Sequence, residues 1–92
     1  MKHQTINLVK FKALARTLRQ PMCHVVGYLE TLWIFCQIQA RDGDLTKFSA
    51  IEIAGWIEYP GDEDEFIQAL VKCKWLDRHE DGRLTVHDWD EN

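Results

Sequence analysis

The chain has 92 residues, which is enough for one small domain. Its hydrophobic content of 46% and its four tryptophans exclude a disordered chain, and its net charge of −4 is unlike that of a free-standing nucleic-acid-binding protein. The longest apolar run, Leu32–Cys36, is too short to span a bilayer, and polar residues follow Met1–Lys2, so the sequence predicts a cytoplasmic protein with no membrane partner.

The charge is unevenly distributed. Residues 1–20 contain five basic residues and no acid, so the other 72 residues carry −9. These basic residues are Lys2, Lys10, Lys12, Arg16 and Arg19. The three cysteines have no Cys-x-x-Cys spacing, which favours reduced thiols and predicts neither a metal site nor a cofactor.

A first helix is predicted from about Asn7, because apolar residues recur at three- and four-residue steps. The inward positions are Leu8, Phe11, Leu14, Ala15 and Leu18. Lys12, Arg16 and Arg19 fall at i, i+4 and i+7 and form one basic stripe on the outer face.

A long second helix is predicted from about Pro21 to Arg41, with an apolar arc covering about half of its circumference. Ile34 and Ile38 fall outside this arc. They are therefore either covered by another segment or exposed and available to a partner. Gly27 weakens the helix unless another backbone packs closely against it.

Capping boxes predict two shorter helices. Ser49 and Glu52 have the S-x-x-E spacing, and Pro60–Gly61 then turns the chain. Asp62 is expected to cap the next helix, with Glu65 three residues later. The expected inward residues are Ile53, Ala54 and Ile57 in the first of these helices, and Phe66, Ala69, Leu70 and Cys73 in the second. The acids at the start of the second of these helices interact with the positive end of the helix dipole and stabilise the helix by about 0.3–1 kcal/mol each. No ligand is needed to explain their presence.

The segment "WLDRHEDGRLTVHDW" predicts a β-hairpin. A two-residue loop at 81–82 would turn polar side chains inward. A three-residue loop at 80–82 pairs Leu76 with Val86 and Arg78 with Leu84, and this register is favoured, with Gly82 left-handed.

A short strand is also expected near Leu45, after "DGD". The order of elements is then helix, long helix, short strand, helix, turn, helix and hairpin, which is the winged-helix order. The sequence thus predicts one α+β domain over residues 1–92, a winged helix-turn-helix with a long second helix and a small three-stranded antiparallel sheet.

Four segments carry a resemblance to a known family. They are "GYLETLWIFC", "DGDLTKFS", "IEYPGDEDEFIQALVKCKWLD" and "GRLTVHDWDE". The chain resembles the N-terminal winged-helix domain of bacteriophage replication-initiator or replisome-organiser proteins and of related uncharacterised bacterial proteins. The resemblance implies a non-catalytic DNA-binding module of a replication or regulatory protein, and implies that the chain is the N-terminal part of a longer one, with a naturally short protein as the alternative.

Two roles are expected from the residues. DNA contact would use the basic first helix, the outward residues of the fourth helix and the hairpin, although Asp64 and Glu65 oppose approach by the fourth helix. The candidate DNA contacts are Lys10, Lys12, Arg16, Arg19, Gln68, Lys72, Arg78 and Arg83, with Lys47 as a further one. The alternative role is protein–protein association without DNA contact, with Ile34 and Ile38 at the interface of a self-associating protein.

An enzyme is not expected. In the "HDWDE" segment, His87 and Asp88 point to opposite faces of a strand and do not converge. The sequence contains neither a Gly-rich phosphate loop nor a nucleophile elbow, and no small-molecule substrate is evident.

Overall fold

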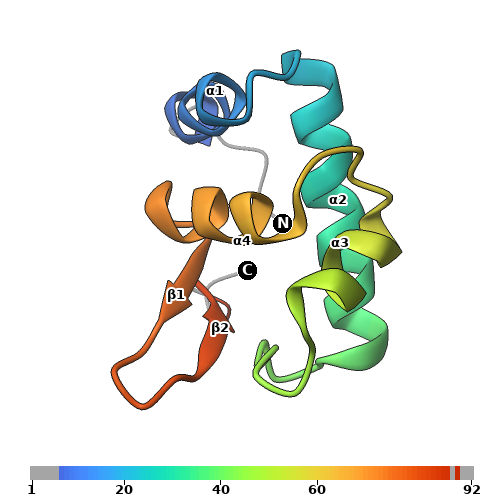
Figure 1. Cartoon of the computed structure of the whole chain (residues 1–92), viewed down its shortest axis with the longest axis vertical. Helices are drawn as coiled ribbons and strands as arrows, with labels where there is room; N and C mark the ends of the chain where they lie inside the picture. Colours follow the sequence, from blue (N-terminus) through green and yellow to red (C-terminus); the bar gives the residue numbers. More distant parts are fainter. Residues whose placement is uncertain (1–6, 88, 90–92) are drawn as a thin grey trace.

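The computed structural model describes residues 7–87 and 89, and this part of the chain is α+β (Figure 1). It contains four helices and one two-stranded antiparallel sheet. The helices are α1 (Asn7–Leu18), α2 (Met22–Gln39), α3 (Ala50–Ile57) and α4 (Glu63–Lys72), and the strands are β1 (Leu76–Arg78) and β2 (Leu84–Val86).

The helices surround one apolar core. α4 crosses the middle of the molecule and contacts α1, α3 and β1, while α2 runs along one edge and contacts α1 and α3 (Figure 1). The largest fully buried side chains are Phe66, Leu14, Leu45, Ile53, Leu70, Leu76, Val25 and Cys36. No described polar or charged residue is buried. Burial raises the pKa of the Cys36 thiol to about 12, so this cysteine stays protonated and unreactive.

Both predicted capping residues are confirmed. The Ser49 hydroxyl accepts the Glu52 N–H at 3.1 Å, and the Glu52 carboxylate accepts the Ser49 N–H at 3.0 Å, which completes the box before α3. An Asp62 carboxylate oxygen accepts the Glu65 N–H at 2.9 Å before α4. Pro21 lies one residue before α2, with φ −61°.

Three helices end on a non-glycine residue with a left-handed backbone, which no sequence signal indicated. These residues are Arg19, Glu58 and Lys74, with φ of 58°, 63° and 67°. In each case the following N–H reaches the carbonyl five residues earlier, as in the bond of 3.0 Å from Gln20 to Ala15. This is the Schellman arrangement, which satisfies helix-end carbonyls and usually employs glycine.

The hairpin has the favoured register. Leu76 pairs with Val86 and Arg78 with Leu84 across a loop in which Gly82 has φ 92°. Leu76 and Leu84 are buried and Val86 is half-buried, so burial of this face selects the three-residue loop.

The prediction of a three-stranded sheet is wrong for the described residues, which form a two-stranded sheet. The segment near Leu45 contributes only an isolated bridge between Asp44 and Thr85, flanked by bonds of 2.8 Å from Leu45 N to Leu84 O and from Val86 N to Gly43 O. The pairing stops there because the Asp44 carboxylate accepts the Thr46 N–H at 2.9 Å and turns the chain toward α3.

Leu8 and Gly27 both lie in open surroundings. Helical periodicity predicts an inward Leu8, but this residue lies in the first turn of α1 and is 54% exposed. Gly27 is expected either to weaken α2 or to allow close packing. No atom lies within 4 Å of the position that a Cβ would take there, so no backbone packs against it.

Candidate nucleic-acid interface

The basic stripe of α1 lies on its solvent face, as predicted. Lys12, Arg16 and Arg19 are exposed, while the opposite side of the helix buries Phe11 and Leu14. α1 ends at Leu18, and Arg19, with its left-handed backbone, lies at the corner between α1 and α2.

Lys10 is separated from that stripe. Its Nζ donates a hydrogen bond of 2.8 Å to the Lys74 carbonyl and lies 4.3 Å from the centre of the Trp75 ring. The ammonium group therefore joins α1 to the corner between α4 and β1, with a cation–π contact in addition to the hydrogen bond. Of the four cations assigned to DNA on α1, three are exposed, and Lys10 is directed to the corner between α4 and β1.

The exposed face of α4 has an acidic and a neutral-to-basic half. Asp64 and Glu65 lie in the first turn and Gln68 and Lys72 further along, and all four are exposed as expected. On the opposite side, Phe66, Ala69 and Leu70 are buried as predicted and Cys73 is half-buried, while Ile67, which was not predicted, is also buried.

A groove of about 560 Å³ lies between the end of α1 and this face of α4. It brings together three of the predicted contacts, Arg19, Gln68 and Lys72, with Glu65 as the one carboxylate among the described residues of its lining. The other lining residues are Thr17, Leu18, Tyr59 and Ala69. Two cations and an amide from distant parts of the sequence thus face the same space, which suits a phosphate-bearing chain.

Thr17 and Tyr59 were missed by the sequence reasoning. Thr17 lies two residues before Arg19, so the end of α1 could have indicated it, but no pattern marks Tyr59. The Tyr59 ring stacks on Phe66 with centroids 4.4 Å apart. Burial, with Tyr28 and the nearby Glu65 and Asp62 carboxylates, raises the Tyr59 pKa, so its hydroxyl remains a hydrogen-bond donor.

A second, smaller groove of about 250 Å³ lies on the hairpin side of α4. Arg78 and Gln68 both line it, together with Asp64 and the Thr46 and Ser49 side chains. Gln68 is therefore shared by the two grooves, with Arg19 and Lys72 on one side and Arg78 on the other.

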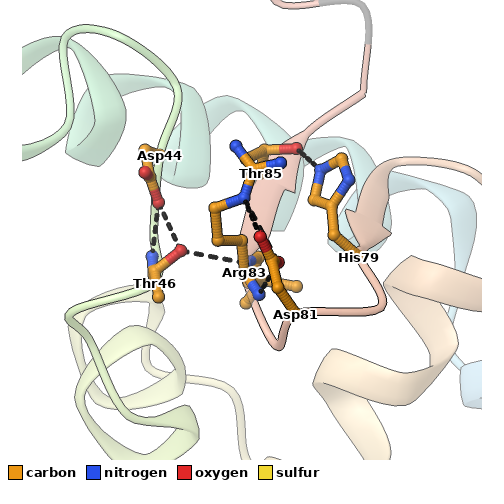
Figure 2. A network of polar contacts seen from close by, with 7 residues as sticks. Asp44, Thr46, His79, Asp81, Arg83 and Thr85 are labelled. Atoms are coloured by element: carbon orange, nitrogen blue, oxygen red, sulfur yellow. Dashed lines mark hydrogen bonds and ion pairs between the residues drawn. The ribbon is translucent and has the colours of Figure 1, made fainter.

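The hairpin tip contributes little net charge. Arg83 Nε lies 2.9 Å from an Asp81 carboxylate oxygen, and both side chains are more than half exposed. Figure 2 shows this pair beside the hydrogen bond of 2.9 Å between His79 and Thr85. The hydrogen bonds from Arg83 lower the Asp81 pKa, so the carboxylate that neutralises Arg83 stays ionised at neutral pH.

A polar link holds the hairpin to the segment before α3. The Asp44 carboxylate accepts hydrogen bonds from the Thr46 N–H and hydroxyl, and the Thr46 hydroxyl oxygen accepts the Leu84 N–H at 3.0 Å (Figure 2). This link fixes the position of β2 relative to α3. Because Arg78 on β1 pairs with Leu84 on β2, the link also fixes where Arg78 lines the smaller groove beside α4.

The remaining candidates lie away from the two grooves. Lys47 lines a different groove with Arg41, and its Nζ lies 5.3 Å from the centre of the Phe48 ring. Ile34 and Ile38 are 52% and 57% exposed on α2. They are not covered by a described segment, which is the second of the two predicted possibilities.

The groups considered for catalysis or metal binding do not form a site in the described part of the chain. No cluster of three or more His, Cys, Asp or Glu side chains there is placed to hold a metal ion. His87 Nδ1 lies 2.8 Å from an Asp77 carboxylate oxygen across the base of the hairpin. Lys2, Asp88, Asp90 and Glu91 lie outside the described residues.

Neither a protein-family model, nor a curated protein, nor a solved structure matches the chain. The resemblance to replication-initiator domains stays a prediction from the residues. Within residues 7–87 and 89, no helix has the length and apolar character needed to cross a membrane.

Proposed function

We propose that the chain is a DNA-binding module of the winged-helix type. In support, α3 and α4 pack on each other across the turn at Pro60–Gly61, and the β1–β2 hairpin follows α4 directly. Two packed helices followed by a hairpin are the parts of a winged helix-turn-helix, in which the second helix approaches the DNA. The resemblance suggests a role in replication or its regulation.

The observation that carries the proposal is the groove shared by Arg19, Gln68 and Lys72. Two cations from different helices can neutralise neighbouring phosphates, and the Gln68 amide can hydrogen-bond an adenine edge or a backbone oxygen. Lys12 and Arg16 are also exposed on α1, but they do not line this groove.

The acidic first turn of α4 sets the direction of approach. Asp64 and Glu65 are exposed there, and phosphates would be repelled by them. The DNA backbone should therefore lie against the end of α1 and the second half of α4. The entry of the first turn of α4 into the major groove, which many helix-turn-helix proteins use, is disfavoured here.

The test is a titration of labelled duplex and single-stranded DNA at several salt concentrations. Arg19→Ala/Lys72→Ala should weaken binding of all sequences alike, and should reduce the steepness of the salt dependence by about 2, because each phosphate contact contributes about 0.9 to the slope. Arg41→Ala/Lys47→Ala is the matched control, since it also removes two cations that line a groove of about 560 Å³. Equal loss in both variants would reject the groove as the contact, and absence of binding at low salt would reject DNA binding.

The alternative is an association module with no DNA contact. The observation that favours it is the exposure of Ile34 and Ile38 on α2, a helix on the edge of the molecule (Figure 1). Molar mass measured on the DNA-titration samples separates the two functions. A concentration-dependent mass without DNA binding would favour association alone.

A further inference from the structure

The outward face of α2 is an uncharged stripe. Its residues are Cys23, Gly27, Thr31, Ile34 and Ile38. They follow one another at steps of four, four, three and four, which keeps them on one side of a helix. Cys23 and Gly27 are small and exposed, whereas Ile34 and Ile38 project large apolar side chains into solvent. The end of the stripe with Cys23 and Gly27 is thus recessed, and the end with Ile34 and Ile38 protrudes.

The spacing makes this stripe complementary to itself. If two α2 helices lie antiparallel about a two-fold axis between Glu30 and Thr31, then Ile34 faces Gly27 of the second copy and Ile38 faces its Cys23. One two-fold axis relates both pairs, because Ile34 and Gly27 lie equally far from it along the helix, and so do Ile38 and Cys23. A two-fold interface requires this reciprocal matching. We propose that two copies of the chain pair through α2 in this antiparallel register.

The uncharged character of the stripe supports a second copy as the occupant, and its area limits how tightly the copies can pair. The stripe itself contains no charged residue, whereas the one acid of α2, Glu30, lies beside it next to the two-fold axis, so the two Glu30 carboxylates oppose a tight pairing. The open space at Gly27 allows the helices to approach closely. A specific interface takes about 800 Å² from each partner, near one seventh of the 5912 Å² accessible surface.

The stripe alone is smaller than such an interface. From Cys23 to Ile38 it runs about 22 Å, at 1.5 Å per residue. Trp56 on α3 is a further exposed apolar side chain, at 45%, and its ring centroid lies 5.5 Å from that of the buried Phe35 on α2. The pair is therefore expected to be a reversible, weak dimer rather than an obligate one.

Cysteine trapping tests the register. The variant Ile38→Cys places a thiol opposite Cys23 of the second copy, and facing helices can bring the two Cα atoms within the 7 Å that a disulfide allows. Mild oxidation should convert most of the protein to a covalent dimer with two disulfides, each joining Cys23 of one copy to the introduced thiol at position 38 of the other, identified by mass spectrometry. Adding Cys23→Ser should abolish the cross-link, because the two introduced thiols would lie about 22 Å apart. The buried Cys36 does not compete, since its thiol stays protonated.

Wild-type mass at rising concentration gives a second, independent readout. Gly27→Leu should weaken dimerisation about tenfold or more, because the new side chain fills the recessed end of the stripe that receives Ile34 of the second copy. Ile34→Asp should weaken it by a similar factor, because it buries an unpaired charge in the interface. Both positions are exposed, so the monomer should keep its fold.

The proposal rests on the association candidate and is independent of DNA binding. A concentration-dependent dimer in which oxidation does not join Cys23 to the thiol introduced at position 38 overturns this register but leaves association standing. A monomer at every concentration overturns both. Loss of DNA binding in the groove variants bears on neither.

Discussion

Gly43 offers the sharpest test of how the fold is held together. It lies in the bend after α2 with φ 78°, and a Cβ at this position would lie 2.6 Å from Cγ of Trp89. The Trp89 ring packs on Trp33 with centroids 4.6 Å apart and the ring planes tilted by 40°, and its Nε1 donates a hydrogen bond of 3.0 Å to the Arg41 carbonyl. An added methyl group must therefore displace Trp89 as well as strain the backbone.

The expected loss for Gly43→Ala follows from these contacts. A left-handed backbone costs a residue with a Cβ about 1–2 kcal/mol. Displacement of Trp89 forfeits a hydrogen bond worth about 0.5–1.5 kcal/mol and an aromatic contact of about the same size. The free energy of unfolding should fall by about 2–5 kcal/mol, a large part of the roughly 5–14 kcal/mol expected for 92 residues.

Two other glycines provide the controls. Gly82 also has a left-handed backbone, with φ 92°, but no atom lies within 4 Å of its Cβ position, so Gly82→Ala should cost only the backbone term of about 1–2 kcal/mol. Gly27 is helical and equally open, so Gly27→Ala should raise stability by about 0.5–1 kcal/mol. Urea unfolding followed by circular dichroism, at protein concentrations below any dimerisation, gives all three values. If Gly43→Ala cost no more than Gly82→Ala, the role assigned to Trp89 would be wrong.

Two further predictions concern the helix ends and the acid limit of stability. Glu58→Gly should raise the free energy of unfolding by about 1 kcal/mol, because Glu58 is exposed and ends α3 with φ 63°, and an unchanged urea midpoint would contradict this. The Thr46 hydrogen bonds lower the pKa of Asp44 below its ordinary 3.8, and those of Ser49 lower the pKa of Glu52 below 4.5. A group whose pKa is lowered by folding stabilises the fold at pH values above its unfolded pKa, and this contribution is lost as the pH falls through its pKa in the folded protein. The free energy of unfolding should therefore be level near neutrality and decrease below about pH 4.5. Asp44→Asn/Glu52→Gln should show a shallower decrease in urea titrations across this range, and an identical pH profile would count against the assignment.

Local interactions could be predicted from the sequence because all their partners lie a few residues apart. Ser49 and Asp62 cap their helices as their spacing indicates, and the hairpin register follows from Gly82 and from burial of Leu76 and Leu84. The acidic residues at the start of α4 are likewise explained by a local interaction, with the dipole of their own helix. Such features depend on backbone geometry within one or two turns of chain.

Other features were decided by tertiary packing alone. The strand expected near Leu45 is only a bridge between Asp44 and Thr85, because the chain turns away at Asp44. The sequence could not show this, since Thr85 is distant from Asp44 along the chain. A stripe of cations on a helix cannot show that Lys10 reaches the Lys74 carbonyl, because that contact spans 64 residues.

The candidate site itself belongs to this second class. The sequence by itself determined which faces of α1 and α4 are polar, since helical periodicity assigns each side chain to a face. Only the packing of α1 against α4 decided that Arg19 shares a groove with Gln68 and Lys72, about fifty residues further along the chain. Periodicity specifies the faces of one helix, whereas the shapes of the buried side chains determine how two helices lie against each other.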